Sequence, residues 1–443
     1  MAEETEKHGK LAVSLAPLYG GKLEIVPKIP VRSLEDFSVW YTPGVAAVCR
    51  AIKEQPDLSL HYTGRWNTIA VVTNGTRVLG LGDIGPEAAL PVMEGKALIF
   101  KYLGGVDAFP LCINAETPER FVDVVKSLEP GLGGINLEDI SSPDCFRILD
   151  VLRDSLQIPV WHDDQLGTAS VTLAALINSL KIVGKKLGDL KIVLFGAGAA
   201  NIATARLLEK AGANLGNVIL VDSRGILHSE RHDMDELMLR NPWKYELGLK
   251  TNREKLTGKL QNALEGSDVL IAASRPGPGV IKKEWVRTMA DDAIVFVLAN
   301  PVPEMWPWEA KEAGARIVAT GRSDFPNQVN NSLLFPSVFR GALDVRARRI
   351  TDGMVLAASK ALAEYVPDDK LSEDYIIPTM DDWEVYVYVA ASVAEHADRE
   401  GVARNPLSYD EALVRARKII NRSRRILKAL MNENIIAPLP KVE

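Results

Sequence analysis

The stretch at residues 190–210, LKIVLFGAGAANIATARLLEK, joins an apolar strand-like run to a glycine-rich turn and then to a helix-like run. Gly196 allows the tight turn, and Gly198 lets the backbone come close to a bound pyrophosphate. The start of the following helix offers free N–H groups and a positive dipole end to the phosphates. Strand, turn and helix in this order form a dinucleotide-binding fingerprint, which an isolated pair of glycines would not.

The third glycine position of the fingerprint holds Asn201, which we expect to change the packing of helix on strand or to contact phosphate. Asp222 ends the next strand-like run, where its carboxylate can accept hydrogen bonds from the ribose hydroxyls of NAD. Arg224 can instead meet the 2′-phosphate of NADP, so NAD and NADP both stay open. A tight turn without any ligand is the alternative. The predicted cofactor contacts are Gly196, Gly198, Ala199, Ala200, Asn201, Asp222, Ser223 and Arg224.

Apolar strand-like runs alternate with helix-like runs on both sides of the fingerprint. The later runs predict a doubly wound, Rossmann-type sheet, and the earlier runs predict an α/β unit with parallel strands. Thr117 and Ser142, each followed by Pro and an acid, are typical helix N-caps in the earlier unit. The nine strand-like runs are residues 67–73, 109–114, 133–139, 158–162, 190–195, 217–222, 268–273, 293–299 and 315–319.

The predicted fold class is therefore α/β, with two domains and a helical C-terminal tail at about residues 351–435. We place the boundary at the start of the long helix-like run that links the two sets of strands. Residues 1–165 would form an N-terminal substrate and metal domain. Residues 166–443 would form the NAD(P)-binding domain together with the C-terminal helices.

The composition is that of a packed globular protein, with 47% hydrophobic and 25% charged residues and a net charge of -6. No long basic run occurs, so we expect no nucleic-acid partner. The three cysteines form no C-x-x-C pair, which is typical of a reducing compartment. We see no apolar stretch of about 18 residues and no secretory signal, and therefore expect no membrane partner and a cytoplasmic location.

Two pairs of acids follow neighbouring strand-like runs, Glu138-Asp139 and Asp163-Asp164. Parallel sheets bind ligands beyond the carboxyl ends of their strands, so we expect these four carboxyl groups to meet in one crevice. Close carboxylates raise each other's pKa, and a hard cation such as Mg²⁺ or Mn²⁺ relieves the repulsion. Helix capping is the alternative, but it explains one acid per strand end and not two. We expect His162 to be packed or to support a ligand, since imidazole suits Mg²⁺ poorly.

Three segments nearer the N-terminus combine Gly or Pro turns with a group capable of acid–base or anion chemistry. Gly-rich loops let the backbone approach a ligand or another loop. The alternative for each group is half-buried packing for a Tyr and a solvated surface charge for an Arg or a Lys. The segments are WYTPGVA at residues 40–46 with Tyr41, RVLGLGDIGPE at 77–87 with Arg77, and PVMEGKA at 91–97 with Lys96.

These segments, taken in order, resemble the motif set of malic enzymes. The length and the HDDQLGTA and SDFPNQVNN forms are similar to those of compact bacterial and archaeal members. GAGAAN departs from the more usual GAGAAG of that family, which leaves the cofactor contacts less defined. The resemblance covers roughly residues 37–340 and rests on WYTPGVA, RVLGLGDIG, PVMEGKA, NLEDI, HDDQLGTA, GAGAA, LANPVPE (298–304) and GRSDFPNQVNN (321–331).

The resemblance implies oxidation and decarboxylation of L-malate to pyruvate and carbon dioxide, with reduction of NAD or NADP and with Mg²⁺ or Mn²⁺ as metal. It implies Lys96 as the base for the malate C2 hydroxyl and Tyr41 as the acid that protonates the enolate of pyruvate. Asp163 would help to tune Lys96, which must be neutral to act; burial and a nearby cation would lower its pKa from about 10.4. The implied metal ligands are Glu138, Asp139 and Asp164.

Substrate binding and assembly are implied in the same way. Asn300 and Asn331 would contact substrate and nicotinamide. Arg77 resembles the larger eukaryotic branch, where an Arg at this position grips a malate carboxylate, whereas compact members often have a small residue. If that role does not transfer, backbone amides would hold the substrate anion. The family also implies a homodimer or a larger homo-oligomer.

Three other functions fit parts of the same pattern. A malolactic-type enzyme, which keeps its NAD bound and converts malate to lactate, would have nearly the same motifs. A metal-free amino-acid dehydrogenase needs a catalytic Lys and Asp but not four carboxyl groups, so the two acidic pairs argue against it. A non-enzymatic, cofactor-sensing paralogue would be expected to have lost Tyr41, Lys96 or a ligand, and none is lost.

Overall fold

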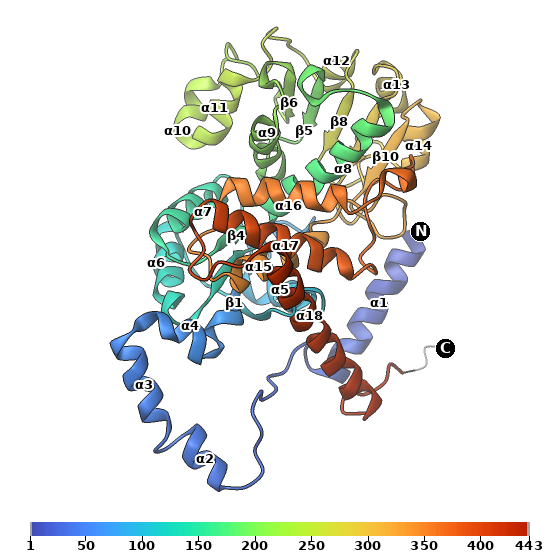
Figure 1. Cartoon of the computed structure of the whole chain (residues 1–443). Coiled ribbons are helices and arrows are strands. Elements are labelled where there is room, and N and C mark those ends of the chain that lie inside the picture. The colour runs from blue at the N-terminus through green and yellow to red at the C-terminus, as the bar shows by residue number, and fades with distance from the viewer. Residues whose placement is uncertain (1, 441–443) are drawn as a thin grey trace.

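The computed structural model describes residues 2–440, which form two lobes, each built around its own sheet (Figure 1). Strands from the first part of the chain form one lobe, and strands from the middle form the other. Helices from the C-terminal part, orange to red in Figure 1, return to lie against the first lobe. The architecture confirms the predicted α/β class with a Rossmann-type unit and a helical C-terminal region.

The first sheet is parallel throughout, with strand order β2-β1-β3-β4. Parallel strands are covered on both faces, and the apolar run of β1 is accordingly buried along almost its whole length. Ile135 of β3 pairs with Val160 of β4, so the carboxyl ends of these two strands reach the same edge. The elements are β1 Thr68–Thr73, α5 Gly85–Gly104, β2 Asp107–Cys112, α6 Pro118–Leu128, β3 Gly134–Leu137, α7 Asp144–Ser155 and β4 Val160–His162.

The second sheet has the strand order β10-β9-β8-β5-β6-β7. The chain runs outward from β5 to β6 on one side and then continues from β8 on the other, so a switch point lies between β5 and β8. Its strands are β5 Ile192–Phe195, β6 Val218–Asp222, β7 Gly225–Ile226, β8 Val269–Ala272, β9 Ile294–Val297 and β10 Ile317–Thr320. Its helices are α9 Ala199–Ala211, α10 Met234–Arg240, α11 Pro242–Lys250, α12 Leu260–Leu264, α13 Lys283–Val286 and α14 Pro307–Glu312.

The helix α8, Thr168–Val183, links the two sheets and is buried along most of its length. It packs against α9 and against α16, Asp352–Glu364. By length and composition alone, Asp163–Val183 would be enough to cross a membrane, but 67% of its apolar 18-residue window lies buried inside the molecule. This is the position of a core helix, and its apolar sequence is explained by burial between the lobes.

The C-terminal helices complete the core of the first lobe. They are α15 Phe335–Asp344, α16, α17 Glu384–Arg399 and α18 Tyr409–Asn432. Phe335 and Phe339 of α15 pack against Phe100 of α5, with ring centroids 4.6 and 5.3 Å apart. A Cβ on Gly134 of β3 would lie 2.9 Å from Phe339, so α15 rests directly on the first sheet. The domain division at residue 165 stays a prediction.

The N-terminal helices lie outside this core. They are α1 Ala2–Tyr19, α2 Glu35–Trp40, α3 Val45–Glu54 and α4 Ser59–Tyr62. Figure 1 shows α2 and α3 on an arm that extends away from the first lobe. No residue of α2 or α3 is buried, whereas Leu60 of α4 is. The arm therefore gains almost no packing from its own chain.

Each of the nine predicted strands corresponds to an observed strand. Thr117 is confirmed as the N-cap of α6, since its hydroxyl accepts a hydrogen bond from the Arg120 amide. The prediction for Ser142 was wrong: α7 begins at Asp144, with Pro143 at the cap position and no side-chain cap bond. The short strand β7, antiparallel to β6, was not predicted, because two residues carry too little pattern.

Candidate active site

The two acidic pairs meet at the edge of the first sheet where β3 and β4 end. Glu138 and Asp139 follow β3, while Asp163 and Asp164 open a single π-helical turn after β4. Such turns are rare and occur often at functional sites. Carboxylate oxygens of Glu138, Asp139 and Asp164 lie within 4.8 Å of one another. The three predicted metal ligands are therefore brought together.

Burial and mutual repulsion raise the pKa of these three carboxyl groups. Burial and the charge of Asp164 raise the pKa of Asp139 to about 7. Burial holds the pKa of Glu138 well above its usual range and also raises that of Asp164. Among the described residues, the buried Oδ2 of Asp139 has no hydrogen-bond partner. An orphaned oxygen within a set of three carboxylates fits a hard divalent cation, which would lower all three pKa values.

Lys96 reaches the same cluster from α5. Its Nζ lies 2.6 Å from Oδ2 of Asp163 and 3.0 Å from Oε1 of Glu138, and its side chain is 10% exposed. The Phe335 ring centroid lies 4.4 Å from Nζ. Burial lowers the pKa of Lys96, but Asp163 and Glu138 more than offset this, so its pKa is raised. The expected lowering depends on a nearby cation and stays a prediction; the described residues that face the amine are two anions, and they raise its pKa.

The turn after β4 fixes the position of Asp163. The indole Nε1 of Trp161 donates to Oδ1 of Asp163 at 2.9 Å. A Cβ on Gly167 would lie 2.0 Å from the same Oδ1, so only glycine leaves room for the carboxylate. His162 is fully buried, and burial lowers its pKa to about 3, which keeps the imidazole neutral. His162 is therefore buried and neutral, and its Nδ1 lies 3.7 Å from Oδ2 of Asp164, so packing and support of a ligand both stay open as its role.

The loop between β1 and α5 closes over Asp139. The amide of Arg77 donates to the backbone oxygen of Asp139 at 3.1 Å, and the amide of Leu79 points at its Oδ1 from 3.5 Å. Asp139 has a φ of 54°, a left-handed conformation that is uncommon outside glycine and often found at functional sites. The Arg77 side chain is exposed, and its charge lowers the pKa of Asp164 against the effect of burial.

The glycine-rich turn lies at the switch point of the second sheet. Gly196 has a φ of 96°, and a Cβ there would lie 2.4 Å from the Ala273 carbonyl after β8. A Cβ on Gly198 would meet nothing within 4 Å, which leaves open space where a ligand could approach. Asn201 donates from Nδ2 to the carbonyls of Phe195 and Ile271, so its amide joins β5 to β8. Of the two roles expected for Asn201, this contact supports packing of helix on strand.

Asp222 is surrounded by donors. Arg231 donates to both of its oxygens, at 3.0 and 2.9 Å, and Lys244 forms an ion pair with it. The amides of Arg224 and Gly225 donate to its Oδ1 at 2.8 and 3.1 Å. The Arg224 side chain pairs with Asp233 and Glu236. A ribose would have to compete with Arg231 and Lys244 for Asp222.

The two predicted substrate asparagines lie at the junction of the lobes. A Cβ on Gly80, in the loop that carries Arg77, would lie 3.1 Å from the backbone oxygen of Asn300. A Cβ on Gly167 would lie 3.1 Å from the Cβ of Asn331, so Asn331 backs onto the turn that holds Asp163. Asn300 thus lies beside the loop that carries Arg77, and Asn331 lies beside the turn that holds Asp163; their contacts with substrate and nicotinamide stay predictions.

Tyr41 is the one predicted catalytic residue that the chain does not bring to the cluster. It caps the C-terminal end of α2, on the extended arm (Figure 1), and is 70% exposed. Within a single chain, Tyr41 thus lies apart from Lys96.

The comparison with known families shows which family the chain belongs to. The sequence matches the N-terminal domain of malic enzymes over residues 20–153 and their NAD-binding domain over residues 166–398. This chain belongs to the malic enzyme family. Lys96, Glu138 and Asp139 fall in the first match and the glycine-rich turn falls in the second, while Asp164 lies in the short stretch between the two.

Several malic enzymes are close to this chain in sequence. The NAD-dependent malic enzyme of Geobacillus stearothermophilus is 52% identical over 385 residues, which are 87% of this chain and 78% of that protein. The bifunctional malic/malolactic enzyme of Bacillus subtilis is 47% identical over 408 residues, 92% of this chain and 97% of that protein. The malic enzyme structure from Entamoeba histolytica is 46% identical and superposes with a TM-score of 0.95, over 99% of this chain and 91% of that one.

Four residues that support the malic enzyme site were not singled out from the sequence. Asn136 donates to Glu138, Trp161 donates to Asp163, and Phe335 faces Lys96. In the sequence these three residues stand at buried or aromatic positions of strands and helices, which are typical of an ordinary core. Gly167 carried a usable signal, since a glycine directly before an apolar helix-like run can mark a close contact.

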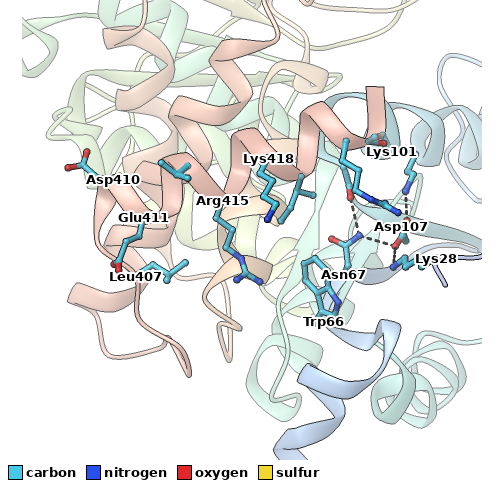
Figure 2. Close-up of a pocket in the computed structure, with 15 residues that line it drawn as sticks. Lys28, Trp66, Asn67, Lys101, Asp107, Leu407, Asp410, Glu411, Arg415 and Lys418 are labelled. Carbon is cyan, nitrogen blue, oxygen red and sulfur yellow. Dashed lines mark hydrogen bonds and ion pairs between the residues drawn. The ribbon is translucent and has the colours of Figure 1, made fainter. Parts of the chain in front are cut away.

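A separate cavity of about 780 Å³ lies between the C-terminal end of α5 and the helix α18 (Figure 2). It is lined by Trp66, Asn67, Lys101, Asp107 and residues of α18 such as Arg415. Lys28 and Lys101 form ion pairs with Asp107, and the Asn67 amide donates to it. None of the predicted site residues lines this cavity. Ser423 of α18, which also lines it, donates from its hydroxyl to the Lys101 carbonyl at 2.7 Å and so joins the C-terminal helix to α5.

Proposed function

We propose that this chain oxidises and decarboxylates L-malate to pyruvate and carbon dioxide, with reduction of NAD or NADP. The observation that carries the proposal is a nearly buried lysine held between Asp163 and Glu138, at the edge of a carboxylate cluster. NAD-dependent and NADP-dependent enzymes both occur among the relatives, so either cofactor is consistent with the family.

Glu138, Asp139 and Asp164 would hold a Mg²⁺ or Mn²⁺ ion. That cation, when bound, polarises the C2 oxygen of malate and stabilises negative charge there. The supporting observations are the raised pKa values of the three acids and the unpartnered Oδ2 of Asp139. Arg77, whose charge reaches Asp164, would pair with a malate carboxylate from the exposed side of the cluster.

Lys96 would accept the proton of the malate C2 hydroxyl while the bound nicotinamide takes the C2 hydride. A cation held by Glu138 would offset one of the two negative charges that raise the pKa of Lys96. Asp163 then keeps the amine in place through its 2.6 Å contact. Loss of carbon dioxide leaves the enolate of pyruvate, and Tyr41 would protonate its C3. The proton taken at the hydroxyl balances the proton given at C3.

A second copy of the chain would supply Tyr41. The arm is rich in exposed apolar side chains, and such patches mark protein interfaces. They include Ile25, Val31, Leu34, Phe37, Val39 and Trp40. Because the arm buries almost nothing in its own chain, a partner surface would explain both its composition and its extension. The proposed assembly is a homodimer whose sites combine Lys96 of one copy with Tyr41 of the other.

Subunit complementation tests this assembly. Lys96→Ala and Tyr41→Phe each inactivate the homodimer, while a mixed dimer keeps one site with both native groups. Refolding the two inactive variants together is therefore expected to restore about a quarter of the wild-type rate at equal amounts, by random pairing. No recovery, in mixtures shown to contain mixed dimers, would place both residues in one chain.

Product analysis tests the reaction itself. With malate, Mn²⁺ and excess NAD, we expect pyruvate and free NADH in equal amounts. A malolactic enzyme would give lactate without net NADH. Lactate is measured as well because the relative from Bacillus subtilis is a bifunctional malic/malolactic enzyme. We further propose a reducing compartment such as the cytoplasm, which is consistent with three free cysteines.

A further inference from the structure

Glu304 is a fully buried carboxylate that joins two loops of the second lobe. Its Oε1 accepts hydrogen bonds from the amide and the hydroxyl of Ser274, at 2.7 and 3.0 Å. Its Oε2 accepts one from the amide of Ala299 at 3.2 Å, and its backbone oxygen accepts one from Ile281 at 3.2 Å. The acid is 0% exposed, and all three groups that donate to its carboxylate are uncharged.

These contacts lie at the carboxyl ends of neighbouring strands. Ser274 follows β8, and Ala299 follows β9, so one side chain bridges the loops at the edge where a dinucleotide binds. A second bridge joins the same loops, since the Gly277 amide donates to the Val302 carbonyl at 3.3 Å. The two loops therefore form one unit.

The bridged loops contact the glycine-rich turn on one side and the loop that carries Arg77 on the other. On the cofactor side, a Cβ on Gly196 would lie 2.9 Å from Cα of Ser274, so the glycine-rich turn rests on the segment that Glu304 holds. On the substrate side, a Cβ on Gly80 would lie 3.1 Å from Pro276 and 3.1 Å from the Asn300 oxygen. Gly80 belongs to the loop whose Leu79 amide points at Asp139.

We infer that Glu304 is a positioning residue that sets the geometry of the cofactor crevice and of its contact with the malate-side loop. The reasoning is energetic. Burying a carboxylate among uncharged donors costs more free energy than burying an apolar side chain of the same size. We therefore expect the order that it imposes on Ser274 and Ala299 to serve the site. An apolar residue would fill the space but would leave both loop ends without a common anchor. The inference rests on the proposed function, because it assigns the crevice to NAD or NADP.

Glu304→Gln in the full-length protein tests the inference. The amide keeps the shape but turns one of its two acceptors into a donor, which then faces Ser274 or Ala299. Glu309→Gln is the matched control, because Glu309 also accepts a loop amide, that of Trp306 at 3.1 Å, but at the start of α14. The readouts are NADH affinity by fluorescence titration, the KM for the oxidised cofactor, kcat, Mn²⁺ affinity and Tm.

For Glu304→Gln we expect NADH affinity to fall and the cofactor KM to rise by about tenfold, the usual consequence of losing a charge-assisted hydrogen bond. Mn²⁺ affinity should stay within about twofold of wild type, and Glu309→Gln should change Tm alone. If Glu304→Gln, like Glu309→Gln, lowers Tm and leaves NADH affinity unchanged, Glu304 has only a structural role and the inference is overturned. Should that variant fail to fold, Ser274→Ala decides, since it removes one donor: weaker NADH binding supports the inference, and unchanged binding overturns it.

These outcomes are separable from failure of the proposed function. Wild-type protein that binds NADH but does not turn over malate would refute the proposed reaction. The NADH affinities of the variants would still test the positioning role of Glu304. Wild-type protein that binds no NADH would refute both.

Discussion

The Nζ atom of Lys96 lies 2.6 Å from Oδ2 of Asp163, while Oδ1 of the same carboxylate accepts the indole N–H of Trp161. The two oxygens of Asp163 thus bind different partners. One is tied to the strand β4, and the other orients the amine proposed to start the reaction. Gly167 leaves the space in which this carboxylate sits.

Replacing Lys96 with Ala should lower kcat by at least about a hundredfold, the usual contribution of a positioned general base. Lys101→Ala is the matched control, because Lys101 lies on the same helix and pairs with Asp107 away from the cluster. It should retain most of the activity. Initial rates of cofactor reduction make the comparison, and circular dichroism checks that both variants fold. Equal rates for Lys96→Ala and Lys101→Ala would remove Lys96 from the mechanism.

Mn²⁺ affinity should depend on pH near neutrality. Without the ion, the pKa of Asp139 is raised to about 7, so binding must displace a proton below that pH. Affinity measured by calorimetry should weaken by at least about tenfold between about pH 8 and pH 6. Asp139→Asn should bind Mn²⁺ weakly throughout, whereas Asp144→Asn, at the start of nearby α7, should resemble wild type. A pH-independent wild-type affinity would contradict this site.

Substitutions of the two fingerprint glycines should affect different properties, stability for Gly196 and cofactor affinity for Gly198. Gly196→Ala places a methyl group 2.4 Å from a carbonyl oxygen at a φ of 96°, so we expect a destabilised protein with a Tm lowered by several degrees. Gly198→Ala meets nothing within 4 Å and should keep its Tm. Its methyl group would instead obstruct a pyrophosphate, so NADH affinity should fall by at least about tenfold. Tight NADH binding by Gly198→Ala would argue against this crevice as the cofactor site.

Asp107 provides a test of stability that is separate from catalysis. Burial raises its pKa, but Lys101, Lys28 and Asn67 more than offset this and bring the pKa to about 2. A lowered folded pKa stabilises the protein above the unfolded value of about 3.9, and this is lost as the pH falls toward about 2. Asp107→Asn should therefore cost about 1–2 kcal/mol in urea unfolding at about pH 6, after allowing for the partial exposure of both lysines. The cost should shrink below about pH 4, and a difference that is the same at about pH 3 and pH 6 would refute this account.

The fold and the acidic cluster followed from local patterns. Adjacent parallel strands bring their carboxyl ends together, so the two acidic pairs after β3 and β4 could be assigned to one site from their positions in the sequence. The glycine-rich turn was recognisable because the order of strand, turn and helix is itself the fingerprint.

The features that the sequence did not reveal depend on contacts between distant segments. Glu304 bonds with Ser274 thirty positions away, and a buried acid in a loop has no periodicity to mark it. The direction of the Asn201 amide depends on carbonyls of β5 and β8. The exposure of Tyr41 depends on where the arm goes, and whether a second copy covers it is a property of the assembly. The raised pKa of Lys96 results from Glu138 and Asp163, which only the folded chain places beside it.

The most direct test follows the absorbance of the reduced cofactor with L-malate and NAD or NADP, for wild type and for Asp164→Asn, with and without added Mn²⁺. We expect wild type to reduce one of the two cofactors only when the ion is present, and to release one pyruvate for each NADH or NADPH. Asp164→Asn should stay inactive at Mn²⁺ concentrations that saturate wild type. Reduction of the cofactor by wild type after complete removal of divalent metal, or full activity of Asp164→Asn, would contradict the claim that the carboxylate cluster holds the ion on which malate reacts.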